Sequence, residues 1–381
     1  MTKEQLTTSR RGRLEFLDAL RGLAAAYVII YHTTLIPQPS LTAPRWLTTV
    51  VLGGGSGVTL FFLVSAFSLY FTMPLRLRER HPTRAFYLHR FFRIAPLFYA
   101  LLVVTLIRDA VIFRTTHSPF EIASSLLLVF NATPGRETGI VWASWTIGVE
   151  VLFYAAFPLI YRRVRSVSEA IAFFFVCLVA WNVIQAFLMY VSNPATAASI
   201  MQWSVFRHLP IFAVGILTYH IYSSFDRDTV EERRFADVGN ALFMGGIFCY
   251  FSWLKGWLPN VFGDSYYWQA IAYSCMFLGL ALSPWRLVVN KATCYLGKIS
   301  YSLYLNHPPV VALLIPAYRW IYTQTPYLTF AFLASVALTF AVVVPLSILT
   351  YELIEAPGIA LGKSLIARAH RRGVSAAAGA R

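Results

Sequence analysis

Residues 14–34 read LEFLDALRGLAAAYVIIYHTT. The run approaches the length of about 20 apolar residues with which a helix crosses a bilayer, yet it contains Arg21 and His32. On a helix, eleven steps of about 100° leave these two side chains only about 20° apart around the axis. A charged residue inside a membrane helix costs at least about 2.5–3.5 kcal/mol on insertion scales. The pattern therefore predicts a membrane span with a polar stripe that serves a function.

The composition of the whole chain also indicates a membrane protein. Of its 381 residues, 57% are hydrophobic and only 13% are charged, whereas soluble domains carry about 25% charged residues. Apolar runs of span length recur from end to end, which predicts an all-α, polytopic transmembrane helical bundle. We expect one integral domain over residues 14–358, between an amino-terminal tail (1–13) and a basic carboxyl-terminal tail (359–381).

The net charge of +15 fits membrane topology better than nucleic-acid binding, because Lys and Arg collect in short loops between the apolar runs. Placing these loops inside predicts about ten spans with both termini in the cytoplasm. The first run is too long for a signal peptide and is interrupted by charges, so we expect it to stay uncleaved. The predicted spans are 14–35, 52–73, 94–113, 142–161, 168–190, 205–222, 237–254, 267–284, 293–316 and 328–350.

The segment 119–131 is apolar but too short to cross comfortably. The run 142–161 ends in Arg162-Arg163-Val-Arg165, which marks an inner end. That run must therefore descend from the outside, which holds only if 119–131 does not cross. We predict a re-entrant or interfacial helix there.

Glu150 lies several residues into the span 142–161, at a depth from which it could approach His32. A buried carboxylate beside an imidazole orients the ring and favours its charged form, which suits a general base acting on a hydroxyl. The alternative is that Glu150 pairs with another buried group for structural reasons. Trp145, on the same run, is a candidate for substrate binding or for packing.

Arg90 and Arg93 lie three residues apart at the inner end of the third predicted span and share a helix face. Two guanidinium groups side by side bind phosphates well. The alternative is an ordinary positive-inside anchor. Asp18, one turn before Arg21, is likewise an alternative partner for that arginine, instead of a pocket.

Residues 297–309 read GKISYSLYLNHPP and place several polar side chains within one predicted span. Ser300, Tyr304 and His307 fall near one helix face. The two prolines that follow would kink or break the helix and free carbonyl groups. Ser300 and Tyr301 could instead simply bond neighbouring helices. The four cysteines lack metal-ligand spacing, and we expect no metal site.

Taken in order, these motifs resemble the bacterial membrane-bound acyltransferase-3 family, whose members acylate hydroxyl groups. The resemblance covers roughly residues 14–358. It is carried by Arg21…His32, Arg90-x-x-Arg93, Trp145-Thr-x-x-x-Glu150, Ser300-Tyr301-Ser-x-Tyr304-x-x-His307 and Glu352-x-x-Glu355-x-Pro357. It implies that His32 is catalytic and that Arg21, Arg90 and Arg93 serve an acyl-coenzyme A donor. An extra hydrolase-like domain found in many relatives is expected to be absent.

The sequence and this resemblance together predict an O-acyltransferase. It would move an acyl group, expected to be acetyl, from cytoplasmic acyl-CoA (acetyl-CoA) to a hydroxyl of a surface polysaccharide, lipid-linked sugar or related glycan. Its donor would enter from Arg90 and Arg93 past Arg21. There His32 would deprotonate the hydroxyl or carry the acyl group itself. Two other classes stay open: a sugar or lipid transporter, which polar intramembrane residues also fit, and a non-catalytic scaffold.

Overall fold

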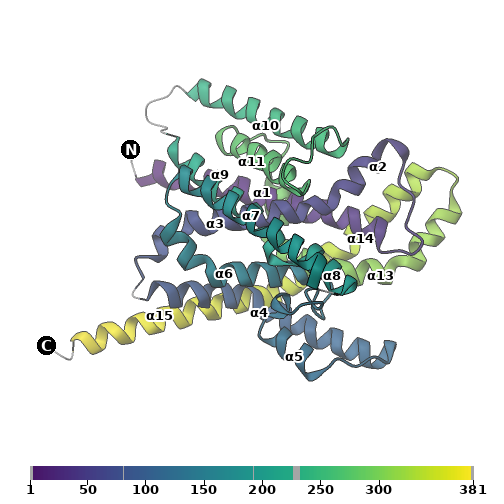
Figure 1. Cartoon of the computed structure of the whole chain (residues 1–381), viewed down its shortest axis with the longest axis horizontal. Coiled ribbons are helices and arrows are strands. Elements are labelled where there is room, and N and C mark those ends of the chain that lie inside the picture. Colours follow the sequence, from purple (N-terminus) through teal and green to yellow (C-terminus); the bar gives the residue numbers. More distant parts are fainter. Residues whose placement is uncertain (1–2, 80, 192, 226–231, 379–381) are drawn as a thin grey trace. The chain divides into compact units, whose positions relative to one another are not determined.

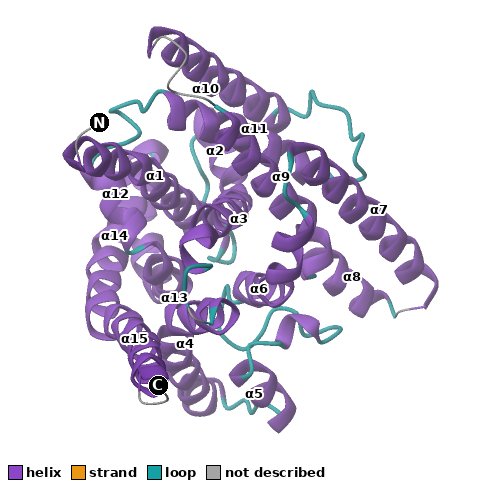
Figure 2. Cartoon of the chain, turned by 90° about the vertical axis from the view of Figure 1, so that its left-hand side faces the viewer, coloured by secondary structure: helices purple, strands orange, loops and turns teal. Residues whose placement is uncertain are grey.

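The computed structural model describes residues 3–79, 81–191, 193–225 and 232–378, and within these ranges it contains helices and no strand (Figure 2). The ends of the two predicted tails, 1–2 and 379–381, lie outside the described residues. The chain forms two compact units. Unit 1 comprises Met1–Phe67, Val164–Ile184 and His208–Pro345, and unit 2 comprises Ser68–Arg163, Gln185–Arg207 and Leu346–Arg381.

Figure 1 labels most of the helices in chain order. Their bounds are α1 (Lys3–Leu35), α2 (Arg45–Leu52), α3 (Gly57–Arg76), α4 (Pro82–Arg108), α5 (Pro119–Leu126), α6 (Trp145–Arg163), α7 (Val167–Val191), α8 (Pro194–Trp203), α9 (Val205–Ser224), α10 (Glu232–Leu254), α11 (Tyr266–Leu282), α12 (Lys291–Lys298), α13 (Ser300–Gln324), α14 (Leu328–Thr350) and α15 (Ala356–Ala378). Short 3₁₀ turns at Gly53–Ser56 and Phe130–Ala132 and π-helical turns at Asp109–Phe113 and Tyr351–Glu355 join or extend them.

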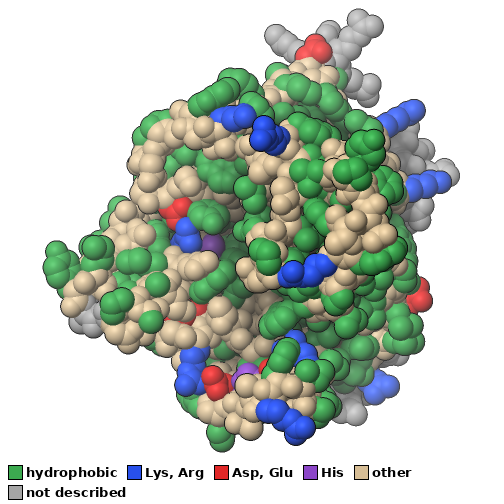
Figure 3. Space-filling model, turned by 90° about the vertical axis from the view of Figure 1, so that its right-hand side faces the viewer, with side chains coloured by type: hydrophobic (Ala, Val, Ile, Leu, Met, Phe, Trp, Pro, Cys, Tyr) green, Lys and Arg blue, Asp and Glu red, His purple; other side chains and the backbone are tan. Residues whose placement is uncertain are grey.

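The helices have the length and surface of a membrane bundle. Among the described residues, five helical segments are long and apolar enough to cross a bilayer: Arg45–Arg76, Pro82–Phe113, Val167–Tyr190, Pro194–Ser224 and Leu328–Arg368. Hydrophobic side chains are spread over the face seen in Figure 3, where charged side chains are few. Such exposed apolar area is unfavourable in water and is expected against lipid. The fold class is confirmed, and the number of ten spans stays a prediction.

The segment predicted not to cross forms the short helix α5. Its eight residues rise only about 12 Å, against a hydrocarbon core of about 30 Å. Ser118 and Glu121 form a capping box: the Glu121 backbone N–H donates to the Ser118 hydroxyl at 3.2 Å, and the Ser118 backbone N–H donates to the Glu121 carboxylate at 2.8 Å. That backbone N–H bond is the main reason why the pKa of Glu121 is lowered. The short helix is confirmed over Pro119–Leu126, and its failure to cross the bilayer stays a prediction.

The predicted span 293–316 is wrong as a single helix, because the chain breaks at Ile299 into α12 and α13. Before this break, α12 packs closely against α1 in unit 1 (Figure 2). A Cβ on Gly22 would overlap the Thr293 carbonyl, and one on Gly297 would overlap the Asp18 carbonyl. The two backbones therefore touch, and this contact fixes the position of α1 beside the start of α13.

We expect Gly297→Ala to destabilise the protein, because the new methyl group meets a backbone atom that cannot move aside. Overpacking of this kind typically costs about 1–3 kcal/mol. Gly245→Ala is the matched control: Gly245 is also inside a helix, with nothing within 4 Å of an added Cβ. There, alanine should stabilise the helix by up to about 1 kcal/mol. Thermal unfolding in detergent should thus shift in opposite directions for the two variants, and equal shifts would contradict the close packing of α1 and α12.

The prolines were expected to kink or break the helix after His307, and the break is wrong, because α13 continues from Ser300 to Gln324 through Pro308 and Pro309. Proline is tolerated inside membrane helices when the carbonyls that it deprives of a donor find other partners. Pro308 has no N–H to give to the carbonyl four residues earlier, that of Tyr304. This carbonyl is therefore available to a side chain on the same helix.

In unit 2, α15 packs along α4, as Figures 1 and 2 both show. Gly358 and Gly362 make the contact: a Cβ on the first would meet Pro96, and a Cβ on the second would meet Phe92. A pair of small residues four apart is a recurrent way to bring membrane helices together. It places Glu355, at the turn before α15, against α4.

Candidate active site

His32 of α1 and His307 of α13 meet in unit 1. The His32 Nδ1 and the His307 Nε2 are 2.8 Å apart, the distance of a hydrogen bond. The ring centroids are 4.9 Å apart and the ring planes differ by 22°. This separation is close to the N–N distance plus the two ring radii, so the two nitrogens face each other. One ring donates and the other accepts.

The two histidines differ in their access to the surroundings. The His307 ring is fully buried, at 0% exposure, whereas His32 is only partly buried. Tyr31 lies beside His32, with the ring centroids 5.1 Å apart. The pair therefore has an inner ring enclosed by protein and an outer ring that is only partly enclosed.

A hydroxyl network holds α1 in register with α13 and α14 next to this pair. The Thr33 hydroxyl donates to the Thr339 hydroxyl at 3.3 Å, and the Tyr318 and Thr339 hydroxyls are 2.7 Å apart. All three side chains are buried at 0% exposure. Because Thr33 follows His32 directly in the helix, the network limits rotation and sliding of α1 against α13.

The predicted polar face of the 300–307 segment is present. Ser300 and Tyr304 are buried with His307, while Tyr301 is only half-buried. The Tyr304 ring contacts the His307 ring, with centroids 5.6 Å apart, and its other neighbour is Phe61, at 5.7 Å. Tyr304 thus supports the inner histidine, as the shared helix face indicated.

Arg21 lies on the same continuous helix as His32. The structure contains its contact with Asp18, which the sequence analysis gave as an alternative to a pocket. Its Nη1 is 3.5 Å from the Asp18 Oδ1, and both side chains are partly exposed, at 31% and 43%. This is a weak, solvent-accessible ion pair. It leaves a role for Arg21 in donor binding as a prediction.

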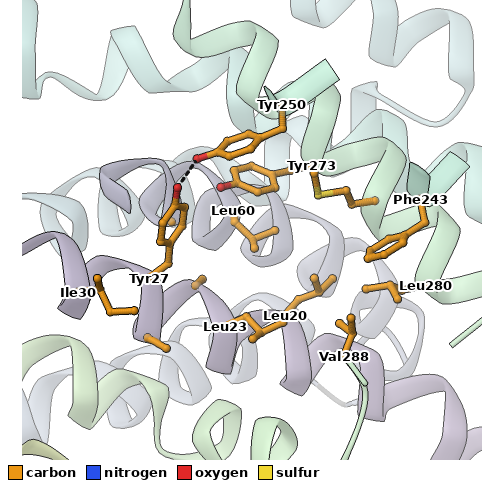
Figure 4. A pocket seen from close by; sticks show the side chains of 14 residues that line it. Leu20, Leu23, Tyr27, Ile30, Leu60, Phe243, Tyr250, Tyr273, Leu280 and Val288 are labelled. Carbon is orange, nitrogen blue, oxygen red and sulfur yellow. Dashed lines mark hydrogen bonds between the residues drawn. The ribbon is translucent and has the colours of Figure 1, made fainter. Parts of the chain in front are cut away.

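A separate cavity of about 390 Å³ lies beside α1 in unit 1, lined by α3, α10 and α11 (Figure 4). The polar groups of its lining are tyrosine hydroxyls, and each already has a hydrogen-bond partner. The Tyr250 hydroxyl donates to that of Tyr27 at 3.1 Å, and the Tyr273 hydroxyl is 2.7 Å from the hydroxyl of Ser56. Five helical steps place Tyr27 roughly 140° around α1 from His32. The cavity is therefore on another side of the helix from the histidine pair.

In unit 2, the two arginines of the predicted pair, Arg90 and Arg93, have different partners. Arg93 contacts the carboxylate of Glu355, whose side chain is fully buried. Arg90 instead lies over the Tyr154 ring, with its guanidinium carbon 5.2 Å from the centroid. The two arginines share α4 as expected, but their surroundings differ.

Glu150 and Trp145 belong to α6 of unit 2. Glu150 is half-buried and has no ion-pair partner within the described ranges. Trp145 packs on Trp203, with ring centroids 4.8 Å apart. A catalytic role for Glu150 beside His32 stays a prediction.

Comparison with known families shows that a model described as an acyltransferase domain matches residues 14–351. The chain belongs to the acyltransferase-3 family. The match includes both histidines and both arginines of the predicted pair, and it ends just before Glu355. The recognition from sequence motifs is thereby confirmed.

Individual relatives of this acyltransferase-3 protein are distant. The acyltransferase MdmB of Streptomyces mycarofaciens is 32% identical over 41% of this chain and 41% of its own length. A provisionally named acetyltransferase of Acidianus two-tailed virus is 24% identical over 79% of this chain and 84% of its own. A provisionally named O-acetyltransferase of Staphylococcus aureus is 23% identical over 90% and 56%. The chain thus spans about half the length of the first and third of these relatives. No solved structure matches it significantly.

Two features of this acyltransferase-3 chain were missed by the sequence analysis. The partnership of His307 with His32 was not predicted, although the shared face of His307 and Tyr304 was its signal. Arg76 was not singled out from the sequence, but part of its guanidinium is buried. In the ranges that the structure covers, no group of three or more His, Cys, Asp or Glu side chains is placed to hold a metal ion.

Proposed function

We propose that this chain is an O-acetyltransferase that moves an acetyl group from acetyl-CoA to a hydroxyl of a surface polysaccharide, lipid-linked sugar or related glycan. The observation that carries the proposal is the 2.8 Å contact between an accessible His32 and a buried His307. Membership of the acyltransferase-3 family supports acyl transfer, and two of the relatives are named for acetyl transfer.

The surroundings of His307 indicate which ring nitrogen carries each proton. The His307 Nδ1 is buried and makes no hydrogen bond of ordinary geometry to the described residues. The carbonyls of Leu303 and Tyr304 are close enough to act on the ring electrostatically, and that of Tyr304 has no helical donor because residue 308 is proline. We assign the His307 proton to Nδ1, facing these carbonyls. The His307 Nε2 then accepts a hydrogen bond from the Nδ1–H of His32, which leaves the His32 Nε2 with a free lone pair.

That lone pair is the base that acyl transfer needs. In the direct route, the His32 Nε2 takes the proton of the acceptor hydroxyl while the hydroxyl oxygen attacks the thioester carbonyl carbon. The C–S bond breaks, the coenzyme A thiolate leaves, and His32 returns the proton to it. In the two-step route, the same nitrogen attacks the thioester carbon, the C–S bond breaks and the coenzyme A thiolate leaves. The acceptor hydroxyl oxygen then attacks the acetyl carbon, the C–N bond to His32 breaks, and the hydroxyl proton passes to the thiolate. Both routes require the proton of His32 to be on Nδ1.

The membrane setting follows the same proposal. Residues 14–358 would be the transmembrane acyltransferase domain of a multi-pass protein of the bacterial inner membrane, with both termini in the cytoplasm, where coenzyme A is made. The arginine-rich loops at the predicted inner ends support this orientation. Arg21, at roughly 16 Å along α1 from His32, would contact the donor before the thioester reaches the base.

The test uses purified full-length protein in proteoliposomes, with acetyl-CoA that carries a labelled acetyl group and with extracted cell-surface glycans as acceptors. We expect label in a base-labile ester on the glycan and one free coenzyme A thiol for each ester formed. Glycan movement across the membrane without thiol release would support the transporter alternative and would contradict the proposal.

A further inference from the structure

Two arginines of unit 2 have buried guanidinium atoms with no hydrogen-bond partner among the residues that the structure describes. They are Arg76, through Nε and Nη1, and Arg90, through Nε. A buried donor without a partner carries the full cost of leaving water, and the cost is higher for a charged group. Such atoms in a native protein require an explanation.

The two arginines lie together with other charged groups at the junction of α3, α4 and α15. The Arg76 charge is within electrostatic range of Arg90 and Glu79, and the His89 ring is within range of Arg76, Arg90 and Lys363. Glu79 approaches His89 at 3.7 Å, and its second carboxylate oxygen is buried with no hydrogen-bond partner among the described residues. Three cations against one carboxylate leave the cluster with a positive excess.

A simple membrane anchor does not explain this arrangement. Arg76 is the last residue of α3, where a cation is favourable at the helix terminus. An anchoring arginine extends its charged end into water or headgroups. Here the donors of Arg76 point into protein and stand near a second arginine, so each charge raises the cost of burying the other.

Arg93 shows what a structural arginine in the same helix looks like. Its guanidinium contacts the fully buried carboxylate of Glu355, and this pairing balances its charge. Arg90, three residues earlier, has the aromatic face of Tyr154 instead of a carboxylate. The pair expected from sequence to act together therefore contains one neutralised arginine and one that has no ion pair with an acid in the part of the chain that the structure describes.

We propose that Arg76 and Arg90, and not Arg90 and Arg93, form a binding site for a phosphate group. The fork of N–H donors on each guanidinium suits phosphate oxygens, and two such forks replace mutual repulsion by charge-assisted hydrogen bonds. This inference rests on the proposed function in one respect: the phosphate is assigned to the coenzyme A donor. A phospholipid headgroup offers the same chemistry and is the other source to be tested.

The experiment measures binding of coenzyme A to the full-length protein in nanodiscs of phosphatidylcholine, by calorimetry at fixed salt. Arg76→Gln and Arg90→Gln should each weaken binding roughly tenfold or more, as expected for loss of a hydrogen bond to a charged group. Arg78→Gln is the matched control, because Arg78 is exposed on the same segment, and it should bind as the wild type does. Phosphate-free pantetheine should show no difference among the four proteins.

Two further measurements keep the proposal testable if a variant is unstable or the ligand is a lipid. Arg76→Gln without ligand should unfold at the same temperature as the wild type or higher, because removing one of two unpaired cations lowers their repulsion. The proteins are then compared in nanodiscs with added phosphatidylglycerol. If Arg76→Gln changes lipid-dependent stability but not coenzyme A binding, the phosphate site is supported and its assignment to the donor is overturned.

The proposal as a whole is overturned if Arg76→Gln and Arg78→Gln behave alike with both ligands. It is also overturned if Arg93→Gln, at matched stability, weakens coenzyme A binding as strongly as Arg90→Gln. Failure of the phosphate site leaves acetyl transfer to glycans intact as a separate result. Conversely, coenzyme A binding that depends on Arg76 in a protein without transfer activity would overturn the proposed function alone.

Discussion

Acetyl transfer by the His32→Ala variant is expected to fall to the uncatalysed background. His32 supplies the only ring nitrogen of the histidine pair that a reactant can reach, since His307 is fully buried. Loss of a general base typically costs about 10²–10⁴-fold in rate, and loss of a nucleophile would cost at least as much. Coenzyme A binding should be nearly unchanged, because the phosphates are assigned to a different part of the chain.

The measurement for His32 is the rate of labelled ester formation at matched protein concentration, with thermal unfolding as the test of folding. His81→Ala is a suitable control, because His81 is exposed at the start of α4 and should retain wild-type activity. An active His32→Ala protein would remove His32 from the chemistry. The family membership would stand, and the base would have to be sought elsewhere.

The second large effect is expected at His307, which acts through His32 and does not touch the substrate. His307→Ala should lower kcat strongly while leaving the KM for acetyl-CoA nearly unchanged. The physical reason is the tautomer: without an acceptor at Nε2, the His32 proton is free to occupy the reacting nitrogen. A catalytic histidine in the wrong tautomer costs up to about 10⁴-fold in serine proteases.

The conservative variant His307→Gln separates positioning from packing. The glutamine side-chain oxygen can accept a hydrogen bond near the place of the imidazole Nε2. We therefore expect His307→Gln to recover a substantial part of the activity lost in His307→Ala, whereas His307→Leu, which fills the space without an acceptor, should not. Equal activity of the Gln and Leu variants would show that His307 serves packing only.

The stripe on α1 could be predicted from sequence because it depends on helix geometry alone. The eleven-residue spacing of Arg21 and His32 fixes their shared face, and the spacing of Ser300, Tyr304 and His307 does the same for α13. The contact between the two helices joins residues 275 positions apart. It depends on close packing at Gly22 and Gly297, which spacing within one helix does not reveal.

The arginines illustrate the same limit. Arg90 and Arg93 occupy adjacent positions on one helix face, and from the sequence both were expected to bind phosphate in the same way. Their difference comes from Glu355, which the glycine contacts of α15 bring against α4. The break at Ile299 was missed because residues 293–316 are long enough to span as one helix. The prolines after His307 were expected to kink or break the helix and to free carbonyl groups. The helix continues through them, and the Tyr304 carbonyl is one that loses its helical donor.

The most direct test of the central claim is a double-mutant cycle on kcat/KM for acetyl transfer, with His32→Ala, His307→Ala and both together. If His307 acts only by setting the tautomer and orientation of His32, the second substitution should add almost nothing once His32 is gone. The effects of residues that work as one unit are grossly non-additive. The account predicts a double variant as active as His32→Ala alone. A double variant in which the two losses multiply would contradict it.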